Sequence, residues 1–191
     1  MTLLVVVLVL TALLRLNELR VSSARRRDRA VPSEAIYPLM VLVHVALFVL
    51  TPLEVLLLDR PFLPALAAVA MLVLAGAVAL RVWVLRSLGS AWNVRVVRPD
   101  HIVSSGPYAL VRHPNYVVVV LELLAIPLIH TAWITAAALS VLNWVVLAVR
   151  IRGEERVLFD IPEYRKAMSG VPRFIPTLRG LRQALQRALT K

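Results

Sequence analysis

The chain has 191 residues, of which 60% are hydrophobic and 17% charged, and this excludes a soluble domain of ordinary composition, in which about half of the residues are apolar. It contains no cysteine, which excludes disulfides, thiolate metal sites and cysteine nucleophiles. The formal charge of +11, from 22 Lys and Arg against 11 Asp and Glu, indicates nucleic acid or an anionic membrane surface as the partner, and the apolar content favours membrane lipids.

The first apolar run covers residues 2–14. As a helix it measures only about 20 Å, so a membrane span must continue past Arg15 to near Val21, which places Arg15 and Glu18 one turn apart. The alternative is a secretory signal peptide. The run lacks a basic start, and Arg25-Arg26-Arg27 follows it instead of a small-residue cleavage site, so we expect a retained span.

Four further apolar runs follow. Residues 37–58 and 62–85 are separated by Asp59-Arg60-Pro61, a short turn that predicts an antiparallel hairpin. Residues 86–115 are rich in Gly, Pro and polar side chains, which predicts a loop or lid at the membrane surface. Residues 116–129 and 131–149 form a second hairpin around His130.

The tail, residues 150–191, is basic and polar, with a possible amphipathic helix at 178–189. Nearly all cations lie in 20–29, 86–112 and 150–191. Five spans place these regions on one face, which should be cytoplasmic, with the N-terminus outside. We therefore predict one all-α integral membrane domain of about five transmembrane helices, with a three-helix part at 1–85 and a second part at 86–191.

Two polar segments on this face flank the second hairpin. One is Gly106-Pro107-Tyr108 with Arg112-His113-Pro114-Asn115-Tyr116, and the other is Arg152-Gly153-Glu154-Glu155-Arg156. An antiparallel hairpin brings both to the same depth. On physical grounds alone, a functional cluster and simple snorkelling or pairing of these charges are equally supported. The four histidines lack metal-ligand spacing, so we expect no metal, and the absence of a Gly-x-Gly motif argues against a Rossmann-type cofactor site.

Both segments, together with Glu163-Tyr164 and Arg173-Phe174-Ile175-Pro176, closely resemble the isoprenylcysteine carboxyl methyltransferase family over residues 83–176. The resemblance implies a membrane enzyme that binds S-adenosylmethionine through its C-terminal half and admits the lipid tail of its acceptor through a gap between helices. Because both segments lie on the predicted cytoplasmic face, we expect the cofactor site there. We predict that Arg112 and His113 carry catalysis and that the cofactor-binding residues are Tyr108, His113, Pro114, Tyr116, Glu154 and Glu155.

The N-terminal half, with Arg15-Leu16-Asn17-Glu18-Leu19 and residues 37–54, is similar to a bacterial branch associated with type III polyketide synthases. That likeness implies O-methylation of long-chain alkylpyrones or alkylresorcinols in a bacterial plasma membrane. Val118 and Ala167 replace a glycine and a tyrosine that are usual in the family, and these departures leave the acceptor open.

Methyl transfer from a sulfonium is an in-line displacement that demands alignment and exclusion of water. A carboxylate or acidic enol acceptor is already ionised, so Arg112 would orient it, whereas a phenol needs a base, for which His113 is the nearest candidate. Glu154 and Glu155 would accept hydrogen bonds from the cofactor's ribose hydroxyls or ammonium, and Tyr108 and Tyr116 would contact its adenine or carboxylate.

Ionisable residues inside the apolar runs are functional candidates because charge is costly there. We expect Arg81 to snorkel from a span end and Glu54 to lie at the interface. His44 and Glu122 either line the acceptor channel or bond between helices.

Three other functions remain open at this point. They are phospholipid N-methylation, a sterol-type reduction that usually needs more spans than this chain supplies, and a non-catalytic lipid-binding scaffold. The scaffold would leave the clustering of Arg112, His113, Glu154 and Glu155 unexplained.

Overall fold

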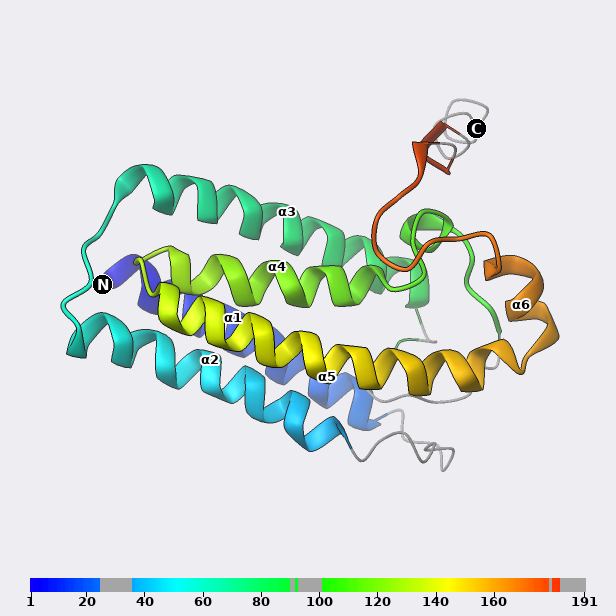
Figure 1. Ribbon diagram of the computed structural model, residues 1–191, viewed down its shortest axis with the longest axis horizontal. Coiled ribbons are helices and arrows are strands. Elements are labelled where there is room, and N and C mark those ends of the chain that lie inside the picture. The colour runs from blue at the N-terminus through cyan, green and yellow to red at the C-terminus, as the bar shows by residue number, and fades with distance from the viewer. Residues whose placement is uncertain (25–35, 90–91, 93–100, 179, 183–191) are drawn as a thin grey trace.

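The structure, a computed structural model, describes residues 1–24, 36–89, 92, 101–178 and 180–182. These residues contain helices and no strand, which confirms the all-α prediction (Figure 1). In chain order the elements are α1 (Thr2–Ala24), α2 (Tyr37–Leu57), α3 (Pro64–Leu88), the short 3-10 helix η3 (Gly106–Ala109), α4 (Pro114–Leu128), α5 (Trp133–Phe159) and α6 (Pro162–Met168).

Helices α1, α2, α3 and α5 are each long and apolar enough to cross a membrane. Their outer faces carry large apolar side chains without protein cover, such as Leu57 and Leu72, each 76% exposed, and Val141, 68% exposed. A water-soluble protein rarely exposes apolar surface on this scale, whereas lipid tails solvate it well. The chain is therefore an integral membrane protein.

Helix α4 differs from the other four predicted spans. It has 15 residues, or a length of about 22 Å, because Pro114 begins it and Pro127 lies near its end. Figure 1 shows α4 between α3 and α5, and it packs on both. Val118 and Ile126 are fully buried, so α4 is an inner helix of the bundle that is shorter than a typical span.

Two predicted boundaries need correction. Helix α5 continues to Phe159 instead of ending at Val149, because the following Arg, Glu and Leu residues are good helix formers although they are not apolar. Glu154 and Glu155 consequently lie on a rigid helix rather than in a loop. The predicted lid is shorter than expected, since α3 extends to Leu88. Most of the predicted helix at 178–189, like the arginines at 25–27, lies outside the described residues.

The start of α5 is capped by a side chain from α2. Glu54 accepts hydrogen bonds from the backbone amides of Ile134 (3.2 Å) and Thr135 (2.6 Å), and from Arg60 Nε (2.9 Å). The first amides of a helix have no partner within the helix, so this carboxylate satisfies two of them. Glu54 is only 8% exposed, because it lies between the end of α2 and the first turn of α5.

Replacing Glu54 by alanine should therefore destabilise the bundle. Loss of a helix cap costs about 0.5–2 kcal/mol, which for a chain of this size lowers Tm by roughly 1–8 °C. Thermal unfolding in detergent measures the effect, and Glu163→Ala, at an exposed position on α6, is the matched control. Equal Tm values for Glu54→Ala and the control would contradict the capping role.

Candidate active site

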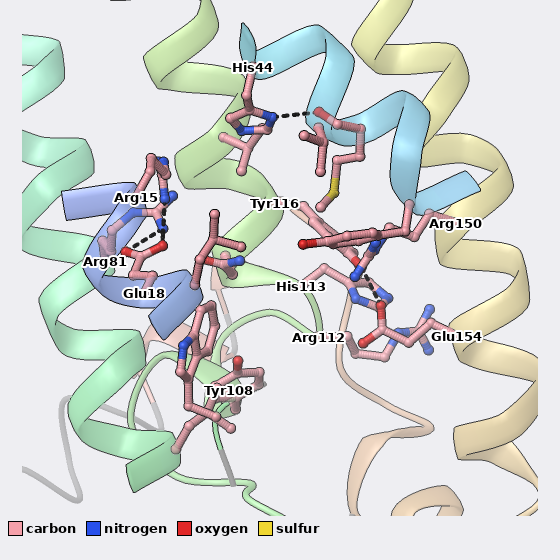
Figure 2. A pocket seen from close by; sticks show the side chains of 18 of the residues that line it. Arg15, Glu18, His44, Arg81, Tyr108, Arg112, His113, Tyr116, Arg150 and Glu154 are labelled. Atoms are coloured by element: carbon pink, nitrogen blue, oxygen red, sulfur yellow. Dashed lines mark hydrogen bonds and ion pairs between the residues drawn. The ribbon is translucent and has the colours of Figure 1, made fainter. Parts of the chain in front are cut away.

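A cavity of about 440 Å³ lies where one end of the helix bundle meets the segment that leads into α4. Side chains from α1 to α5, from η3 and from α6 line it. Figure 2 shows its labelled polar side chains in two groups, with Arg15, Glu18 and Arg81 on one side and Tyr116, His113 and Arg150 on the other. Both segments singled out in the sequence contribute to this cavity.

The Gly106-Pro107-Tyr108 turn is seated against the end of α3. Gly106 has a φ of +60°, and a Cβ at this position would collide with Ser87 Oγ, so glycine is required both by conformation and by space. The turn buries the phenol of Tyr108, and burial together with the negative charge of Glu154 raises its pKa. Tyr108 therefore stays protonated at neutral pH and can donate a hydrogen bond into the cavity.

Glu155 gathers three cationic or polar side chains around one carboxylate. His113 Nε2 lies 3.1 Å and Arg112 Nη2 3.2 Å from Glu155 Oε1, while Arg173 Nη2 lies 2.6 Å from Oε2. Arg112 also makes a cation–π contact with Phe159, in which the guanidinium carbon lies 5.2 Å from the ring centre. Glu155 itself does not line the cavity; it holds Arg112 and His113, which do.

The C-terminal segment closes over this group. The backbone amides of Arg112 and His113 donate to the carbonyl oxygens of Pro172 (2.8 Å) and Arg173 (3.1 Å), and Phe174 packs near the imidazole of His113, with ring centres 6.2 Å apart. The hydrogen bonds to Glu155 raise the pKa of Arg173. Sequence reasoning gave Arg173 no role, although the residue belongs to a segment that carried the family resemblance.

A second hydrogen-bonded group joins α4 to α5. Tyr116 OH donates to Glu154 Oε2 at 2.5 Å and accepts from Arg150 Nε at 2.8 Å. All three side chains line the cavity. Sequence reasoning missed Arg150, although a cation directly after an apolar run, here buried, is a usable signal.

The cavity lining also contains apolar side chains. Those from α1 and α2 are Leu16, Leu19, Met40, Val41, Val45 and Phe48. Val41 and Val45 are also exposed on the surface of the bundle. The cavity thus combines hydrogen-bonding groups with apolar surface that suits a hydrocarbon chain.

Deeper in the bundle, four charged residues form what we call the ion-pair quartet: Arg15, Glu18, Arg81 and Glu122. Arg81 lies 2.8 Å from Glu18 and 3.2 Å from Glu122, and Arg15 pairs with the same two carboxylates. The prediction that Arg81 snorkels is wrong: it is 5% exposed, because two acidic partners compensate its charge inside the bundle. Glu122 bonds between helices, one of the two roles expected for it.

His44 lines the cavity from α2. Its Nδ1 lies 2.8 Å from the carbonyl oxygen of Met40, one turn earlier on the same helix. Of the two roles expected for His44, the structure supports the cavity-lining one.

Five of the predicted site residues line the cavity: Tyr108, Arg112, His113, Tyr116 and Glu154. Glu155 lies behind them, and Pro114 begins α4 without lining the cavity. Val118 is fully buried on α4 and does not itself line the cavity. Ala167 is exposed on α6. No group of His, Asp or Glu suited to a metal ion occurs among the described residues.

Comparison with known proteins identifies the family of this chain. Residues 68–160 match the isoprenylcysteine carboxyl methyltransferase (ICMT) family. A relative from Bacillus subtilis (strain 168), the uncharacterized protein YpbQ, is 36% identical over 149 residues, which cover 77% of this chain and 86% of that protein. The family consists of membrane methyltransferases that act on lipophilic substrates. With its helical membrane fold and its matching segment, the chain belongs to the isoprenylcysteine carboxyl methyltransferase family.

Proposed function

We propose that this protein transfers a methyl group from S-adenosylmethionine to an oxygen of a lipophilic acceptor. The observation that carries the proposal is that one cavity is lined both by the hydrogen-bonded group Tyr116, Glu154 and Arg150 and by apolar side chains from α1 and α2. A polar methyl donor and a lipid-like acceptor need contrasting surfaces within reach of each other. This cavity supplies both, at one end of a membrane bundle.

The residues present fit the donor. Its ribose hydroxyls and ammonium require acceptors such as the carboxylate of Glu154, and its carboxylate requires donors such as Tyr108 and Arg150. The cavity of about 440 Å³ is within the usual range for small-molecule sites. When bound there, the donor supplies an activated methyl group on a sulfonium.

Glu154 and Glu155 then have different tasks. Glu155 is already bonded to Arg112, His113 and Arg173, so we assign it to positioning those side chains and assign donor contact to Glu154. Because His113 Nε2 is engaged by Glu155, we also assign His113 to shaping the pocket. Arg112 remains the residue that orients the acceptor oxygen.

The acceptor tail would lie against the apolar side chains of α1 and α2, where both a prenyl chain and a long alkyl chain would fit. Incubating the purified protein with methyl-labelled S-adenosylmethionine and a panel of prenylated cysteines, alkylpyrones, alkylresorcinols and phospholipids, followed by lipid extraction, tests the proposal. Label on an oxygen of any of the first three supports it. Label confined to a phospholipid amine would establish N-methylation instead, and no label in any product would favour a scaffold.

Glu154→Gln should weaken binding of S-adenosylmethionine by about tenfold or more, because one charge-assisted hydrogen bond is worth about 1.5–3 kcal/mol. Isothermal calorimetry on the detergent-solubilised protein measures the affinity. Glu163→Gln, which removes an exposed carboxylate on α6, serves as the control. Unchanged affinity in Glu154→Gln would remove this residue from the donor site.

The site should face the cytoplasm, where S-adenosylmethionine is made. The clustering of Lys and Arg in 86–112 and 150–191 supports this orientation, since cytoplasmic loops are rich in these residues. A reporter fused to the C-terminus should therefore be active only as a cytoplasmic marker. Activity as an external marker would reverse the orientation.

A further inference from the structure

Three large apolar side chains that follow α6 have little protein cover. Ile175 is 81%, Leu178 78% and Leu181 44% exposed. We call these three residues the C-terminal patch. They lie outside the membrane-spanning helices, so the contact between those helices and lipid tails does not account for them. Single exposed apolar residues are common on protein surfaces, whereas three so close in the sequence indicate a surface that has a partner.

The local structure places two residues of the patch on one face. Thr177 caps a helical turn, since its Oγ1 accepts from the amide of Gly180 at 3.1 Å and its carbonyl oxygen from the amide of Leu181 at 3.0 Å. Leu178 and Leu181 are three positions apart and are therefore neighbours on this turn. Arg182 follows them and is exposed. An apolar face beside a cation is typical of a segment that lies in a membrane interface.

The bilayer around the bundle is within reach of the patch. Phe174, directly before it, packs on Trp144 of α5, with ring centres 6.1 Å apart. Trp144 is 59% exposed on a membrane-spanning helix, so it faces lipid. The chain from Phe174 to Leu178 spans at most about 14 Å, which keeps Leu178 close to the same lipid surface. In Figure 1 this part of the chain (red) ends to one side of the bundle.

The charge around the patch favours anionic lipid as its partner. Among the described residues after α5, the exposed cations are Arg165, Lys166, Arg173 and Arg182, and they outnumber the exposed acids Asp160 and Glu163. Cations close to a bilayer are attracted to anionic head groups. A lipid surface offers acyl chains for the patch and head groups for these cations in one place.

The residues before the patch cover the candidate site. We call residues 171–174 the strap. The carbonyl oxygens of Pro172 and Arg173 accept the amides of Arg112 and His113 at 2.8 and 3.1 Å, and both of the latter side chains line the cavity. The patch follows the strap with no other element between them. A patch held in lipid therefore limits how far the strap can move away from Arg112 and His113.

We propose that the C-terminal patch inserts into the anionic leaflet at the α6 end of the bundle, and that this lipid contact keeps the strap closed over Arg112 and His113. The partner is a phospholipid surface, and docking needs no further protein. The insertion is independent of the proposed function, whereas its effect on the methyl donor rests on that function.

The first experiment locates the patch. Because the chain contains no cysteine, an introduced cysteine can carry a polarity-sensitive fluorophore at one chosen position. In phosphatidylglycerol nanodiscs, the label at Leu178→Cys should be quenched by nitroxide-bearing lipids. The label at Glu163→Cys, an exposed position on α6, should be quenched by aqueous iodide instead. In phosphatidylcholine nanodiscs the lipid quenching at Leu178→Cys should be weaker, and equal quenching in both lipids would overturn the preference for anionic lipid.

The second experiment tests the link to the strap in phosphatidylglycerol nanodiscs. In the double variant Ile175→Asp with Leu178→Asp, the amides of Arg112 and His113 should exchange hydrogen at least about tenfold faster than in wild type. The affinity for S-adenosylmethionine, measured by calorimetry, should fall about threefold or more, by the factor by which the closed fraction falls. Ala167→Asp with Ser169→Asp adds the same charge at exposed positions and should change neither value. Ile175→Phe with Leu178→Phe keeps the apolar contact and should also match wild type.

Unchanged exchange in the Asp variant, or equally fast exchange in its control or in the Phe variant, would overturn the coupling between patch and strap. A label at Leu178→Cys that iodide reaches and lipid nitroxides do not would overturn the insertion. A label shielded from both quenchers would overturn it as well, and a dimer in solution would then assign the patch to a second copy of the chain. Faster exchange with unaltered donor affinity would overturn the effect on the donor. If wild type does not bind S-adenosylmethionine while the quenching and exchange results hold, the lipid anchor stands and the proposed function fails.

Discussion

Removing the carboxylate of Glu122 should lower Tm by roughly 6–20 °C. Glu122 is buried on α4 and faces Arg15 of α1 and Arg81 of α3. The substitution Glu122→Leu leaves two arginines to share Glu18 inside the bundle, and breaking a buried pair in this way costs about 3–5 kcal/mol. At roughly 2–4 °C per kcal/mol for a chain of this size, this is the largest stability effect that the structure predicts.

The ion-pair quartet carries equal numbers of positive and negative charges, which provides an internal control. The double variant Arg81→Met with Glu122→Met removes one charge of each sign and leaves the Arg15–Glu18 pair, 2.9 Å apart within α1. Because well-packed apolar residues often replace a buried pair without loss, this variant should recover most of the lost Tm. Thermal unfolding in detergent compares the three proteins. A double variant as unstable as Glu122→Leu would show that the quartet does not act through charge balance.

The quartet also bears on the site. The buried apolar residues of α1, Leu4, Val7 and Leu8, all lie near its start. The ion pairs of Arg15 and Glu18 therefore hold the other half of α1, which lines the cavity, against the bundle. We therefore expect Glu122→Leu to weaken acceptor binding as well as stability. The two effects share one cause, the position of α1.

Hydropathy was sufficient to locate the helices, because each apolar run of the sequence became a helix with only small shifts at its start. It failed at the end of α5, where Arg150 to Phe159 continue the helix: helix propensity, not apolarity, keeps that stretch helical. The prediction that an antiparallel hairpin of α4 and α5 brings the two polar segments together is confirmed by the His113–Glu155 and Tyr116–Glu154 hydrogen bonds.

The quartet and the contacts of Arg173 were beyond reach from the sequence. Arg15 and Glu122 are separated by 107 positions and Glu18 and Arg81 by 63, and hydropathy carries no information on which faces of different helices meet. For this reason the sequence predicted that the Arg81 side chain would extend to the membrane–water interface. Arg173 contacts Glu155 only because the chain doubles back from α6 over the start of α4, a path that depends on loop geometry.

Arg112→Lys should reduce turnover by roughly tenfold to a hundredfold while donor affinity changes by no more than a few fold. Arg112 lines the cavity; Nη2 is bonded to Glu155 at 3.2 Å, and the buried Nε has no partner among the described residues. Lysine keeps the charge and loses the planar fork, so it can hold Glu155 or orient the acceptor oxygen, but not both in fixed geometry. A lost charge-assisted hydrogen bond of about 1.5–3 kcal/mol corresponds to this range of rates.

Steady-state kinetics with saturating donor, together with calorimetric donor affinity, separates alignment from binding. Arg165→Lys is the control, because Arg165 on α6 makes an exposed contact with the carbonyl oxygen of Phe159 and lies outside the cavity. Added guanidinium should restore part of the activity of Arg112→Ala, because the free ion can reproduce the planar donor set. If Arg112→Lys instead turned over an alkylphenol or prenylated cysteine as fast as wild type, Arg112 would have no part in aligning the acceptor, and its bond to Glu155 would be its whole contribution.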